Sequence, residues 1–420
     1  MIRSPRAILA LLTLLNFINY LDRFLIAAVA PKIQEELGIG DGEVGAIMSA
    51  FMLGYFLTSP AFGWLGDRYP RKGLIAAGVL GWSLATAASG GAMTFTAMYA
   101  TRVFVGIGEA SYASLSPTII DDMSTPQNKN RDLAIFYSAT PIGSALGFML
   151  GGWLQDSFGW RTAFYIAGAP GVLLAVLTLL IVEPKRTRAA EPAAAKVDAA
   201  RTASPYRTLL REPVYLFAVA GYVLQTFALG GFTMWAPAFL YRKLCMDLKS
   251  ANFWFGAVAV VTGFAGTAIG GWIADRMKGD RVEACLRICA WSSVVAAPFA
   301  FLTLIMPTPV TFFLAIGACE LALFTSVSPI NAAVMLSVPT AVRANAMAFS
   351  IFAIHLLGDW RSPILIGDVS ERMGDASKQC SGGRGLQLGM YMLPVALALS
   401  VIAWGWGARA RSAAAAKAQG

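Results

Sequence analysis

Charged residues are scarce in this sequence of 420 residues. Asp, Glu, Lys and Arg make up only 14% of the chain, whereas a soluble globular domain carries about 25%. Hydrophobic residues make up 57% and the mean hydropathy is +0.61. This composition excludes a water-soluble globule and predicts an integral membrane protein.

Residues that serve enzymes and metal sites are also few. The chain has a single histidine. It contains neither a Gly-x-x-x-x-Gly-Lys phosphate loop nor a Gly-x-Ser-x-Gly nucleophile motif. It also leaves no stretch long enough for a soluble nucleotide-binding domain. We therefore expect no catalytic residues, no metal site, no cofactor and no enzymatic activity.

Cysteine offers little further chemistry. None of the five cysteines belongs to a Cys-x-x-Cys pair, and none has a histidine nearby. Ordinary packing inside the protein is the role we expect for them. They are Cys245, Cys285, Cys289, Cys319 and Cys380.

Long apolar runs are abundant instead. Twelve runs reach the length of about 20 residues that crosses a hydrocarbon core of ~30 Å. The sequence thus predicts an all-α membrane protein with twelve transmembrane helices. The runs lie near 7–30, 44–66, 73–93, 97–118, 131–155, 160–182, 213–240, 251–275, 284–306, 309–334, 343–370 and 385–408.

The first run also has features of a signal peptide. Arg3 and Arg6 precede an apolar stretch, and Ala28-Val29-Ala30 resembles a cleavage site. However, Asp22 and Arg23 interrupt the stretch before that site, and removing it would leave eleven spans. We therefore interpret the segment as the first transmembrane helix.

The distribution of basic residues predicts the orientation. With the N-terminus inside, the cytoplasmic segments hold 22 Lys and Arg residues, the outer loops hold 8 and the spans hold 3. Both termini are then cytoplasmic, and the short loops favour a bacterial inner membrane. The net charge of +9 follows from this topology and from contact with membrane lipid. A nucleic-acid partner is not expected.

A charged motif is repeated in the two halves of the chain. Gly63 to Lys72 reads Gly-Trp-Leu-Gly-Asp-Arg-Tyr-Pro-Arg-Lys between the second and third spans, and Gly271 to Arg276 repeats the Gly-x-x-x-Asp-Arg spacing. The repeat predicts two pseudo-symmetric six-helix bundles, at 1–182 and 213–420. Residues 183–212 form a basic cytoplasmic linker, in which the segment around Ala189 to Ala203 is either a short amphipathic surface helix or disordered.

These features together resemble the major facilitator superfamily. The loop at Gly63 to Lys72 is similar to that family's signature between spans 2 and 3, except at Pro70, and Arg102-x-x-x-Gly106-x-Gly108 resembles a second motif. Within the superfamily the chain resembles the Spinster group of lysolipid and sphingosine-phosphate transporters. The strings that carry this resemblance are Asn19–Arg23, Gly106–Tyr112, Pro117–Ile120, Pro141–Ser144 and His355–Asp359. Trp360-Arg361 departs from the small residues expected after the last string.

Charges inside the spans are the main functional candidates, because each costs at least ~2.5–3.5 kcal/mol to insert. Asp22 and Arg102 fall at similar depths in spans 1 and 4, where they are close enough to pair. Glu109 lies two turns from Arg102 on nearly the same helix face. We interpret Asp22, Arg102 and Glu109 as a proton path, with Asp22 as the acceptor. The alternative is a permanently ionised pair that holds the two spans together.

Other polar residues are candidates for substrate contact. Arg23 suits an anionic group, and His355 and Asp359 share a face at i, i+4. His355 serves either as a proton relay or as a hydrogen-bonded packing residue, and Glu320 either as a substrate contact or as a core carboxylate. The full set of expected substrate contacts is Asn19, Tyr20, Arg23, Tyr112, Glu320, His355 and Asp359.

The repeated loop motif predicts a conformational latch. Asp67 is expected at the cytoplasmic start of a neighbouring helix, where the helix dipole favours an anion. Arg68 and Arg71 are expected to bind acidic residues of the same half. The alternative is a solvated charge cluster that only sets topology. The predicted latch residues are Gly63, Asp67, Arg68, Arg71, Asp275 and Arg276.

The residues and the resemblance favour one function. Aromatic residues outnumber amides and hydroxyls in spans 7 and 8, which suits an amphiphile with a charged head and a hydrocarbon tail. We expect a monomeric, proton-coupled secondary transporter of a lysophospholipid or sphingoid phosphate, anionic or zwitterionic. The alternatives are a multidrug or organic-anion proton antiporter, a passive scramblase, and a non-transporting sensor.

Overall fold

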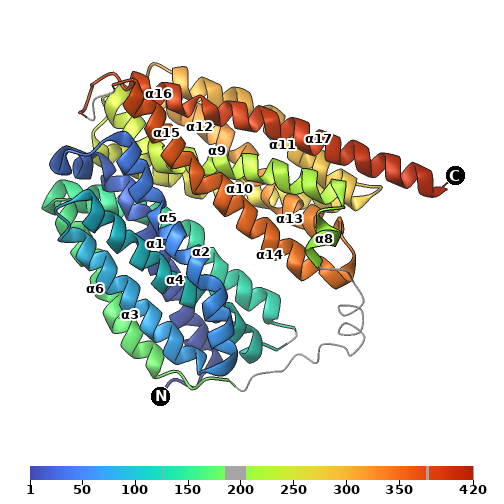
Figure 1. Ribbon diagram of the computed structural model, residues 1–420, viewed down its shortest axis with the longest axis horizontal. Coiled ribbons are helices and arrows are strands. Elements are labelled where there is room, and N and C mark those ends of the chain that lie inside the picture. Colours follow the sequence, from blue (N-terminus) through green and yellow to red (C-terminus); the bar gives the residue numbers. More distant parts are fainter. Residues whose placement is uncertain (126, 185–204, 375–377, 420) are drawn as a thin grey trace. The chain divides into compact units, whose positions relative to one another are not determined.

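The computed structural model describes residues 1–125, 127–184, 205–374 and 378–419, and helices dominate this part of the chain (Figure 1). The helices are α1 (Pro5–Leu37), α2 (Asp41–Arg68), α3 (Arg71–Gly90), α4 (Phe95–Met123), α5 (Lys129–Phe158), α6 (Trp160–Leu179), α8 (Pro205–Leu209), α9 (Pro213–Lys243), α10 (Leu248–Arg276), α11 (Arg281–Ile305), α12 (Pro309–Thr325), α13 (Val327–Leu336), the 3₁₀-helix η1 (Thr340–Val342), α14 (Arg343–Ala353), the π-helix η2 (Ile354–Asp359), α15 (Arg361–Arg372), α16 (Arg384–Met390) and α17 (Met392–Gln419).

Eleven helical segments of the described chain are long and apolar enough to cross a membrane. The remaining expected span, 343–370, corresponds to α14, η2 and α15, which are short pieces in series. The π-helix interrupts the α-helical ladder there, and the segment carries the charged residues Asp359 and Arg361. The all-α membrane fold predicted from the sequence is confirmed.

The first helix is an integral part of the core. It runs without a break through Asp22 and Arg23 and buries Leu12, Leu15 and Leu25 completely. Its left-handed C-terminal Gly38 closes the last turn with a hydrogen bond to the carbonyl of Gln34. This packing favours the interpretation of α1 as a transmembrane helix.

Contacts between residues divide the chain into two compact units. Unit 1 comprises Met1–Thr187, Met234–Val260 and Pro363–Leu386, and unit 2 comprises Arg188–Thr233, Val261–Ser362 and Gln387–Gly420. Unit 1 thus adds parts of α9, α10 and α15 to the first six helices. The predicted bundles at 1–182 and 213–420 remain a prediction. Most of the expected linker, 185–204, lies outside the described residues.

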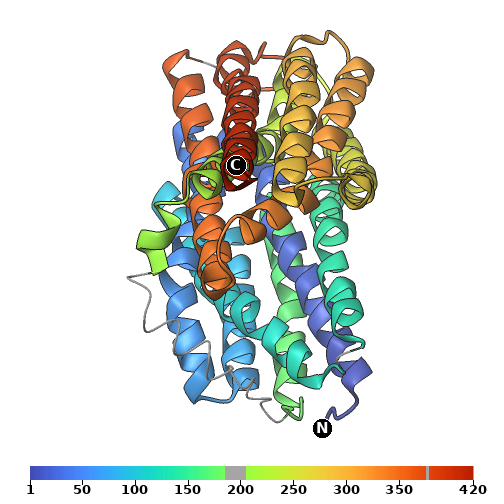
Figure 2. The same cartoon turned by 90° about the vertical axis from the view of Figure 1, so that its right-hand side faces the viewer.

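Unit 1 is built from three closely packed helix pairs, α1 with α5, α2 with α4, and α3 with α6. Its core gathers buried aliphatic and aromatic side chains, among them Leu12, Trp82, Tyr112 and Ile119. The N-terminus returns to the end of α6, where Ile2 and Ile181 form an isolated bridge (Figure 2). The bridge ties the two ends of the first six helices together.

Glycines allow α5 to lie very close to α1. Gly143, Gly147 and Gly151 recur at every fourth position of α5, the small-xxx-small pattern of close membrane helices. A Cβ atom on Gly143 would lie 2.5 Å from the carbonyl oxygen of Phe17, and one on Gly147 would lie 2.7 Å from that of Leu21. No larger residue fits there without a shift of the backbone.

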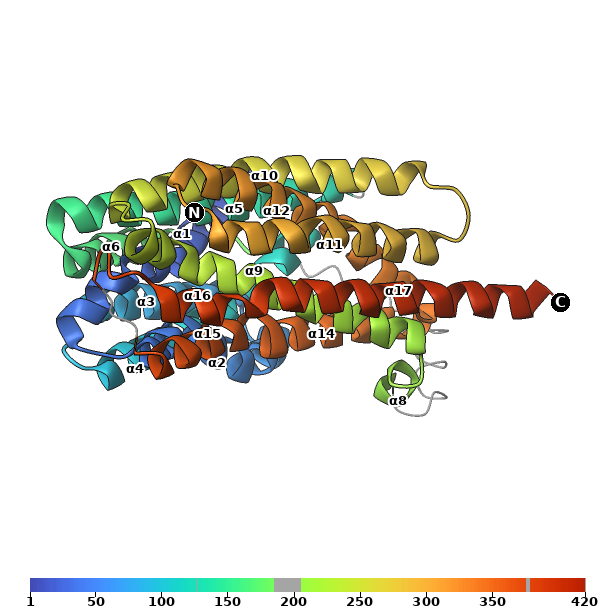
Figure 3. The ribbon, with the colours of Figure 1, turned by 90° about the horizontal axis from the view of Figure 1, so that it is seen from above.

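In unit 2, α17 runs beside α11, and α11 also packs against α12 (Figure 3). The core of this unit includes Tyr215, Leu286, Val334 and Trp404. The indole of Trp404 donates a hydrogen bond of 3.1 Å to the carbonyl of Ala218. A buried indole N–H needs such a partner, and the bond links α17 to α9.

The glycine packing predicts opposite effects for two matched substitutions. Gly147→Ala forces α5 away from α1, so we expect a loss of about 1–3 kcal/mol in unfolding free energy, typical of overpacking. Gly81→Ala in α3 adds a methyl group with no atom within 4 Å, so it should be neutral or slightly stabilising. Thermal unfolding in detergent measures both. Equal midpoints for the two variants would contradict this account of the α1–α5 interface.

Candidate functional site

Three charged side chains are buried inside the first helices of unit 1. Asp22 on α1 and Arg102 on α4 are completely buried, and Glu109 on α4 is 1% exposed. Charge–charge interactions connect these three groups with one another, and they connect Arg102 and Glu109 with Arg23. The structure thus brings the predicted proton-path residues together in one cluster.

The ion pair within this cluster differs from the expected one. Asp22 and Arg102 form no direct hydrogen bond or ion pair among the described residues, so the predicted pair is not present in this structure. Arg23 binds Glu109 instead, with 2.6 Å between Nη2 and Oε2. Its guanidinium also lies 4.8 Å from the ring centre of Tyr20 and 4.6 Å from that of Phe51. Arg23, expected to bind substrate, is therefore held by a carboxylate and an aromatic cage.

Several polar atoms of the cluster are buried without a hydrogen-bond partner among the described residues. They are both carboxylate oxygens of Asp22, Nε of Arg23, all three guanidinium nitrogens of Arg102, Oε1 of Glu109 and Nδ2 of Asn19. Buried polar atoms in folded proteins are nearly always bonded, so unbonded ones need an explanation. Such atoms provide free donors and acceptors for a proton, a water molecule or a ligand.

Tyr112 is a core residue in this structure. Its side chain is 1% exposed, and its hydroxyl donates a hydrogen bond of 2.5 Å to the carbonyl of Leu12. The ring also lies edge-on to Trp82. The substrate contact expected at Tyr112 is not supported, because its polar group already joins α4 to α1.

The predicted pair on the broken helix of unit 2 is confirmed. His355 Nδ1 lies 2.9 Å from Oδ2 of Asp359, and both side chains are partly exposed. The pair lies on η2, where the amide of Trp360 donates to the carbonyl of His355 in the i→i+5 pattern of a π-helix. Such turns are frequent at functional sites. The guanidinium of Arg361 lies 5.3 Å from the ring centre of Trp360.

Glu320 is the other buried acidic residue of unit 2 that the sequence singled out. It is 2% exposed on α12, and its Oε2 accepts a hydrogen bond of 3.0 Å from Thr262 on α10. No lysine or arginine of the described residues is recorded as an ion-pair partner for it. A carboxyl group so placed either stays neutral or awaits a cationic partner.

One member of the predicted latch binds acidic residues as expected. Arg71, only 6% exposed, forms ion pairs with Asp122 at 2.6 Å and with Glu183 at 2.9 Å. It also donates a hydrogen bond of 3.0 Å to Thr118. Arg71 therefore ties the start of α3 to the end of α4 and to the segment after α6.

Arg68 does not bind an acid in the way the sequence suggested. Its guanidinium stacks on the indole of Trp64 at 3.8 Å, and in unit 2 Arg276 stacks on Trp272 at 4.0 Å. The repeated motif thus produces the same Trp–Arg contact twice.

The remaining latch residues are more exposed. Asp275 is 72% exposed and pairs with Arg281 at 3.2 Å. Gly63 has open space where a Cβ would lie, whereas a Cβ on Gly66 would meet Leu115. The tightly packed glycine of the motif is therefore Gly66, and the latch role of Gly63 stays a prediction.

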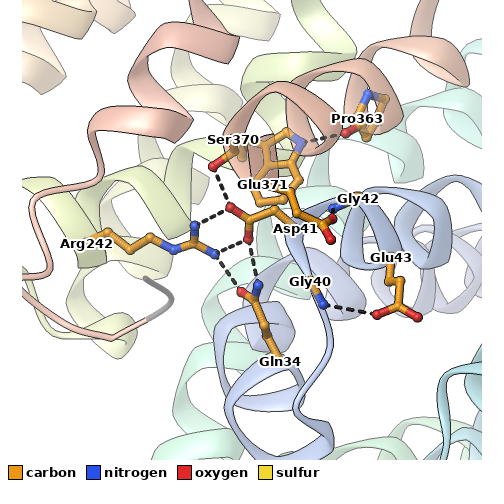
Figure 4. A network of polar contacts seen from close by, with 10 residues as sticks. Gln34, Gly40, Asp41, Gly42, Glu43, Arg242, Pro363, Ser370 and Glu371 are labelled. Atoms are coloured by element: carbon orange, nitrogen blue, oxygen red, sulfur yellow. Dashed lines mark hydrogen bonds and ion pairs between the residues drawn. The ribbon is translucent and has the colours of Figure 1, made fainter. Parts of the chain in front are cut away.

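A buried polar network that the sequence analysis missed joins the ends of α1, α2, α9 and α15 in unit 1 (Figure 4). Arg242 binds Asp41 through two parallel hydrogen bonds of 2.8 Å each, and it also donates to Gln34 at 2.6 Å. Gln34 and Ser370 both donate to the same carboxylate. Arg242 is 1% exposed and Asp41 is 2% exposed. The pair is bidentate, desolvated and extensively hydrogen-bonded.

Close backbone packing surrounds this network. A Cβ on Gly45 would lie 2.3 Å from the carbonyl oxygen of Pro363, and one on Gly367 would lie 2.2 Å from that of Asp41. Asp41 and Arg242 are 201 residues apart, and each stands at the end of an apolar run, where charges are routine. No local pattern marked them as partners.

A disulfide lies beside the network and corrects the expectation for two cysteines. Cys245, after α9, is bonded to Cys380, before α16, and both belong to unit 1. The loop that contains Cys380 is hydrogen-bonded to the last turn of α9, through the carbonyls of Tyr241 and Arg242. The disulfide therefore fixes the backbone from which Arg242 extends. Cys285, Cys289 and Cys319 are free and buried, as predicted.

Comparison with known proteins identifies the family. The family model of the Major Facilitator Superfamily matches residues 12–358. Protein spinster homolog 1 of Bos taurus is 35% identical over 389 residues, which cover 87% of this chain and 73% of that protein. The chain belongs to the Spinster family of the major facilitator superfamily. It is thus a membrane transporter of that family, and its relatives are not enzymes.

Two further Spinster proteins extend the comparison. Protein spinster of Drosophila melanogaster is 31% identical over 379 residues, covering 88% of this chain and 62% of that protein. The sphingosine-1-phosphate transporter SPNS2 of Danio rerio is 32% identical over 394 residues, covering 89% of this chain and 78% of that protein.

Solved structures agree on the fold. A bacterial homolog of the human lysosomal transporter Spinster, crystallised in an inward-facing and unoccupied conformation, superposes with a TM-score of 0.83 at 21% identity. The match covers 96% of this chain and 97% of that chain. The nucleoside transporter NupG superposes with a TM-score of 0.72 at 15% identity, covering 95% of this chain and 98% of that one.

Removal of one partner from the buried network should be costly. Arg242→Met leaves the carboxylate of Asp41 buried without its cation, so we expect a loss of about 3–5 kcal/mol in unfolding free energy. Lys249→Met is the matched control, because its pair with Asp156 in the same unit is about half exposed and should contribute at most about 1 kcal/mol. Unfolding of the purified protein measures both. A similar small loss in the two variants would contradict the network's stabilising role.

The disulfide predicts a simple thiol count. Protein denatured without a reducing agent should react with a maleimide at three cysteines, because two are bonded to each other. After reduction it should react at five. Intact-mass measurement of the labelled protein separates the two results. Five labels before reduction would show that the Cys245–Cys380 bond is absent.

Proposed function

We propose that this Spinster protein is a proton-coupled secondary transporter of an amphiphilic, lipid-like substrate, a lysophospholipid or a sphingoid phosphate. The observation that carries the proposal is the cluster of Asp22, Arg102, Arg23 and Glu109. Four ionisable groups are buried together there, yet only Arg23 and Glu109 are directly paired. A purely structural cluster would be expected to pair all four, because unpaired buried charges are costly.

The cluster suggests how a proton is coupled to movement. Asp22 has no cationic partner in direct contact, and the hydroxyl of Thr86 is the one side-chain group that interacts with it as a hydrogen-bond neighbour, so ionising it in place would cost several kcal/mol. Loss of its proton therefore requires water or the approach of a cation, and Arg102 is the nearby free one. Binding of Asp22 by Arg102 would in turn change the field at Glu109. That rearrangement couples proton release to the position of α1 against α4.

Arg23 links proton binding at Glu109 to substrate binding. Its bond to Glu109 competes with any anionic ligand for the guanidinium. If Glu109 takes up a proton, Arg23 is released to bind a phosphate bidentately. Tyr20 and Asn19, beside it on α1, offer an aromatic ring and an unbonded amide group. These three residues are the substrate contacts that we favour in unit 1.

The substrate class is supported from two directions. The zebrafish relative is named as a sphingosine-1-phosphate transporter, and a sphingoid phosphate combines a phosphate, an amine and a long apolar chain. In unit 2, Glu320 offers a buried carboxylate for a cationic amine, and the His355–Asp359 pair offers a partly exposed one. Within unit 1, Arg23 suits the phosphate of such a head, and within unit 2 these acidic groups suit its amine.

Two polar clusters are proposed to control access from the two sides of the membrane. In the predicted orientation, the Asp41–Arg242 network lies at the outer side and Arg71 at the cytoplasmic side. The network joins α1 and α2 of the first half to α9 and α15 of the second, so outward opening must break it. The ion-pair partners of Arg71 are Asp122 of the first half and Glu183 at the start of the linker, so its contacts persist as a latch when the two halves separate.

The disulfide supports the proposed orientation independently of the basic residues. Disulfides form in oxidising compartments such as the bacterial periplasm. The loops that contain Cys245 and Cys380 are both on the outer side if the termini are cytoplasmic. We therefore propose a bacterial inner membrane with both termini inside. No oligomer partner is needed for the cluster, and we propose that the transporter acts as a monomer.

The test measures flux in proteoliposomes. Fluorescent lysophospholipid uptake is followed with and without an imposed pH gradient for the parent and for Asp22→Asn, which removes the ionisable group at nearly constant shape. We expect gradient-driven uptake in the parent and only the gradient-free rate in the variant. Asp156→Asn is the matched control, because Asp156 is 55% exposed and lies outside the cluster; it should transport like the parent.

Other outcomes identify the other functions. Gradient-driven movement of a cationic dye without lysolipid movement would indicate a drug antiporter. Lysolipid movement that ignores the gradient would indicate a scramblase, and binding of lysolipid without flux would indicate a sensor. Full gradient-driven transport by Asp22→Asn would refute the proton role of Asp22 while leaving the substrate class intact.

A further inference from the structure

A long groove lies on unit 1 along the first halves of two of its helices. It has a volume of about 1250 Å³ and is formed by the first halves of α1 and α5 and the end of α4. None of Asp22, Arg23, Arg102 and Glu109 lines it. Its lining is polar at one end and mostly apolar beyond it, where Thr13 and Ser138 add two hydroxyl groups. The groove therefore belongs to no site described so far.

The two helices that form the groove carry the same pattern. On α1, Arg6 is followed on one face by Leu9, Ala10, Thr13 and Phe17. On α5, Arg131 is followed by Ile135, Ser138, Ala139 and Ile142. The ends of Arg6 to Phe17 and of Arg131 to Ile142 are each eleven positions apart, or about 16 Å at 1.5 Å per residue. This length is about half of a ~30 Å hydrocarbon core, which is the depth of one leaflet.

The end of the groove that holds the arginines suits an anion. Arg6 and Arg131 are exposed, and Asp132 is the one acidic residue in the lining, so the formal charge of the lining is +1. The carboxylate of Asp132 is already engaged by Ser124 at 2.8 Å and by Arg131 at 3.0 Å. The donor-bearing residues Ser4, Ser124, Thr125 and Asn128 line the same end.

Two helix N-termini also meet at this end. Neither Ser4, before α1, nor Asn128, before α5, caps its helix with a side-chain hydrogen bond. The first backbone N–H groups of both helices therefore lack that acceptor, and both helix dipoles present their positive ends there. Further along the groove, Thr13 has a buried hydroxyl with no hydrogen-bond partner among the described residues. The groove thus offers charge at the headgroup level, an unused hydroxyl below it, and an apolar wall beyond.

We infer that this groove holds an anionic phospholipid of the cytoplasmic leaflet as a resident ligand, distinct from the transported substrate. The phosphate group lies between Arg6 and Arg131, and the acyl chains lie along α1 and α5. Basic pockets between transmembrane helices on the cytoplasmic side bind anionic headgroups in this way. The volume exceeds the ~300–1,000 Å³ of common small-molecule sites and suits a lipid with two chains. Only the choice of leaflet rests on the proposed orientation.

Native mass spectrometry of the full protein tests the inference by titration with phosphatidylglycerol and, separately, with phosphatidylcholine of the same chains. We expect one tightly bound phosphatidylglycerol and clearly weaker binding of phosphatidylcholine. In the double variant Arg6→Gln/Arg131→Gln the affinity for phosphatidylglycerol should fall roughly tenfold to thirtyfold, from the loss of two surface cations. Lys129→Gln is the control, because Lys129 starts the same helix, pairs with Asp121 and does not line the groove.

A second variant keeps the test independent of the arginines. Ala10 lines the groove and is exposed, so Ala10→Trp fills the space for the acyl chains while both cations remain. It should also lose the bound phosphatidylglycerol. Equal binding of the two lipids, or unchanged binding in both variants, would overturn the inference. Gradient-driven movement of labelled phosphatidylglycerol across proteoliposomes would overturn its resident role, because the groove would then belong to the transport pathway.

Discussion

The buried ion pair between Arg242 and Asp41 is the interaction on which the account of this transporter depends. A membrane interior has no water to satisfy polar groups, so a buried charge is tolerated only with a full set of partners. Arg242 and Asp41 have most of that set, because they bind each other through two hydrogen bonds and also bond Gln34 and Ser370. The disulfide between Cys245 and Cys380 holds the adjacent backbone. The conformation of this end of unit 1 is consequently held by several mutually supporting contacts.

The charge cluster around Asp22 shows the opposite condition. Asp22, Arg102 and Glu109 are as deeply buried as the network and Arg23 is 13% exposed, yet Asp22 and Arg102 form no ion pair among the described residues. A satisfied network stabilises one arrangement, whereas an unsatisfied cluster changes when a proton, water or ligand arrives. In our proposal the Asp41–Arg242 network keeps the outer side closed, and the cluster around Asp22 responds to the proton and the substrate. A transporter needs both a stable network and a responsive cluster, because a protein held in one conformation cannot alternate between inward-facing and outward-facing states.

Local patterns in the sequence predicted much of this structure. The apolar runs predicted the helices, and the i, i+4 spacing predicted the contact between His355 and Asp359. The acidic partners of Arg71 also lay in the expected half. Contacts between distant residues were missed, because Asp41 and Arg242 are 201 residues apart and helix ends commonly carry charge. The pairing of Arg23 with Glu109, in place of Asp22 with Arg102, depends on side-chain directions that spacing alone does not determine. The bond between Cys245 and Cys380 was missed because these cysteines are 135 residues apart and no local pattern pairs them.

The most direct test of the central claim is a distance measurement across the proposed outer gate. Spin labels at Ile39, after α1, and Met373, after α15, report the separation of the helix ends that the Asp41–Arg242 network joins. The account predicts a short and a longer distance whose ratio changes between pH 5 and pH 8 in the parent, and a ratio independent of pH in Asp22→Asn. A single distance that stays the same at every pH, with and without lysolipid, would contradict the claim that this network opens in response to the proton.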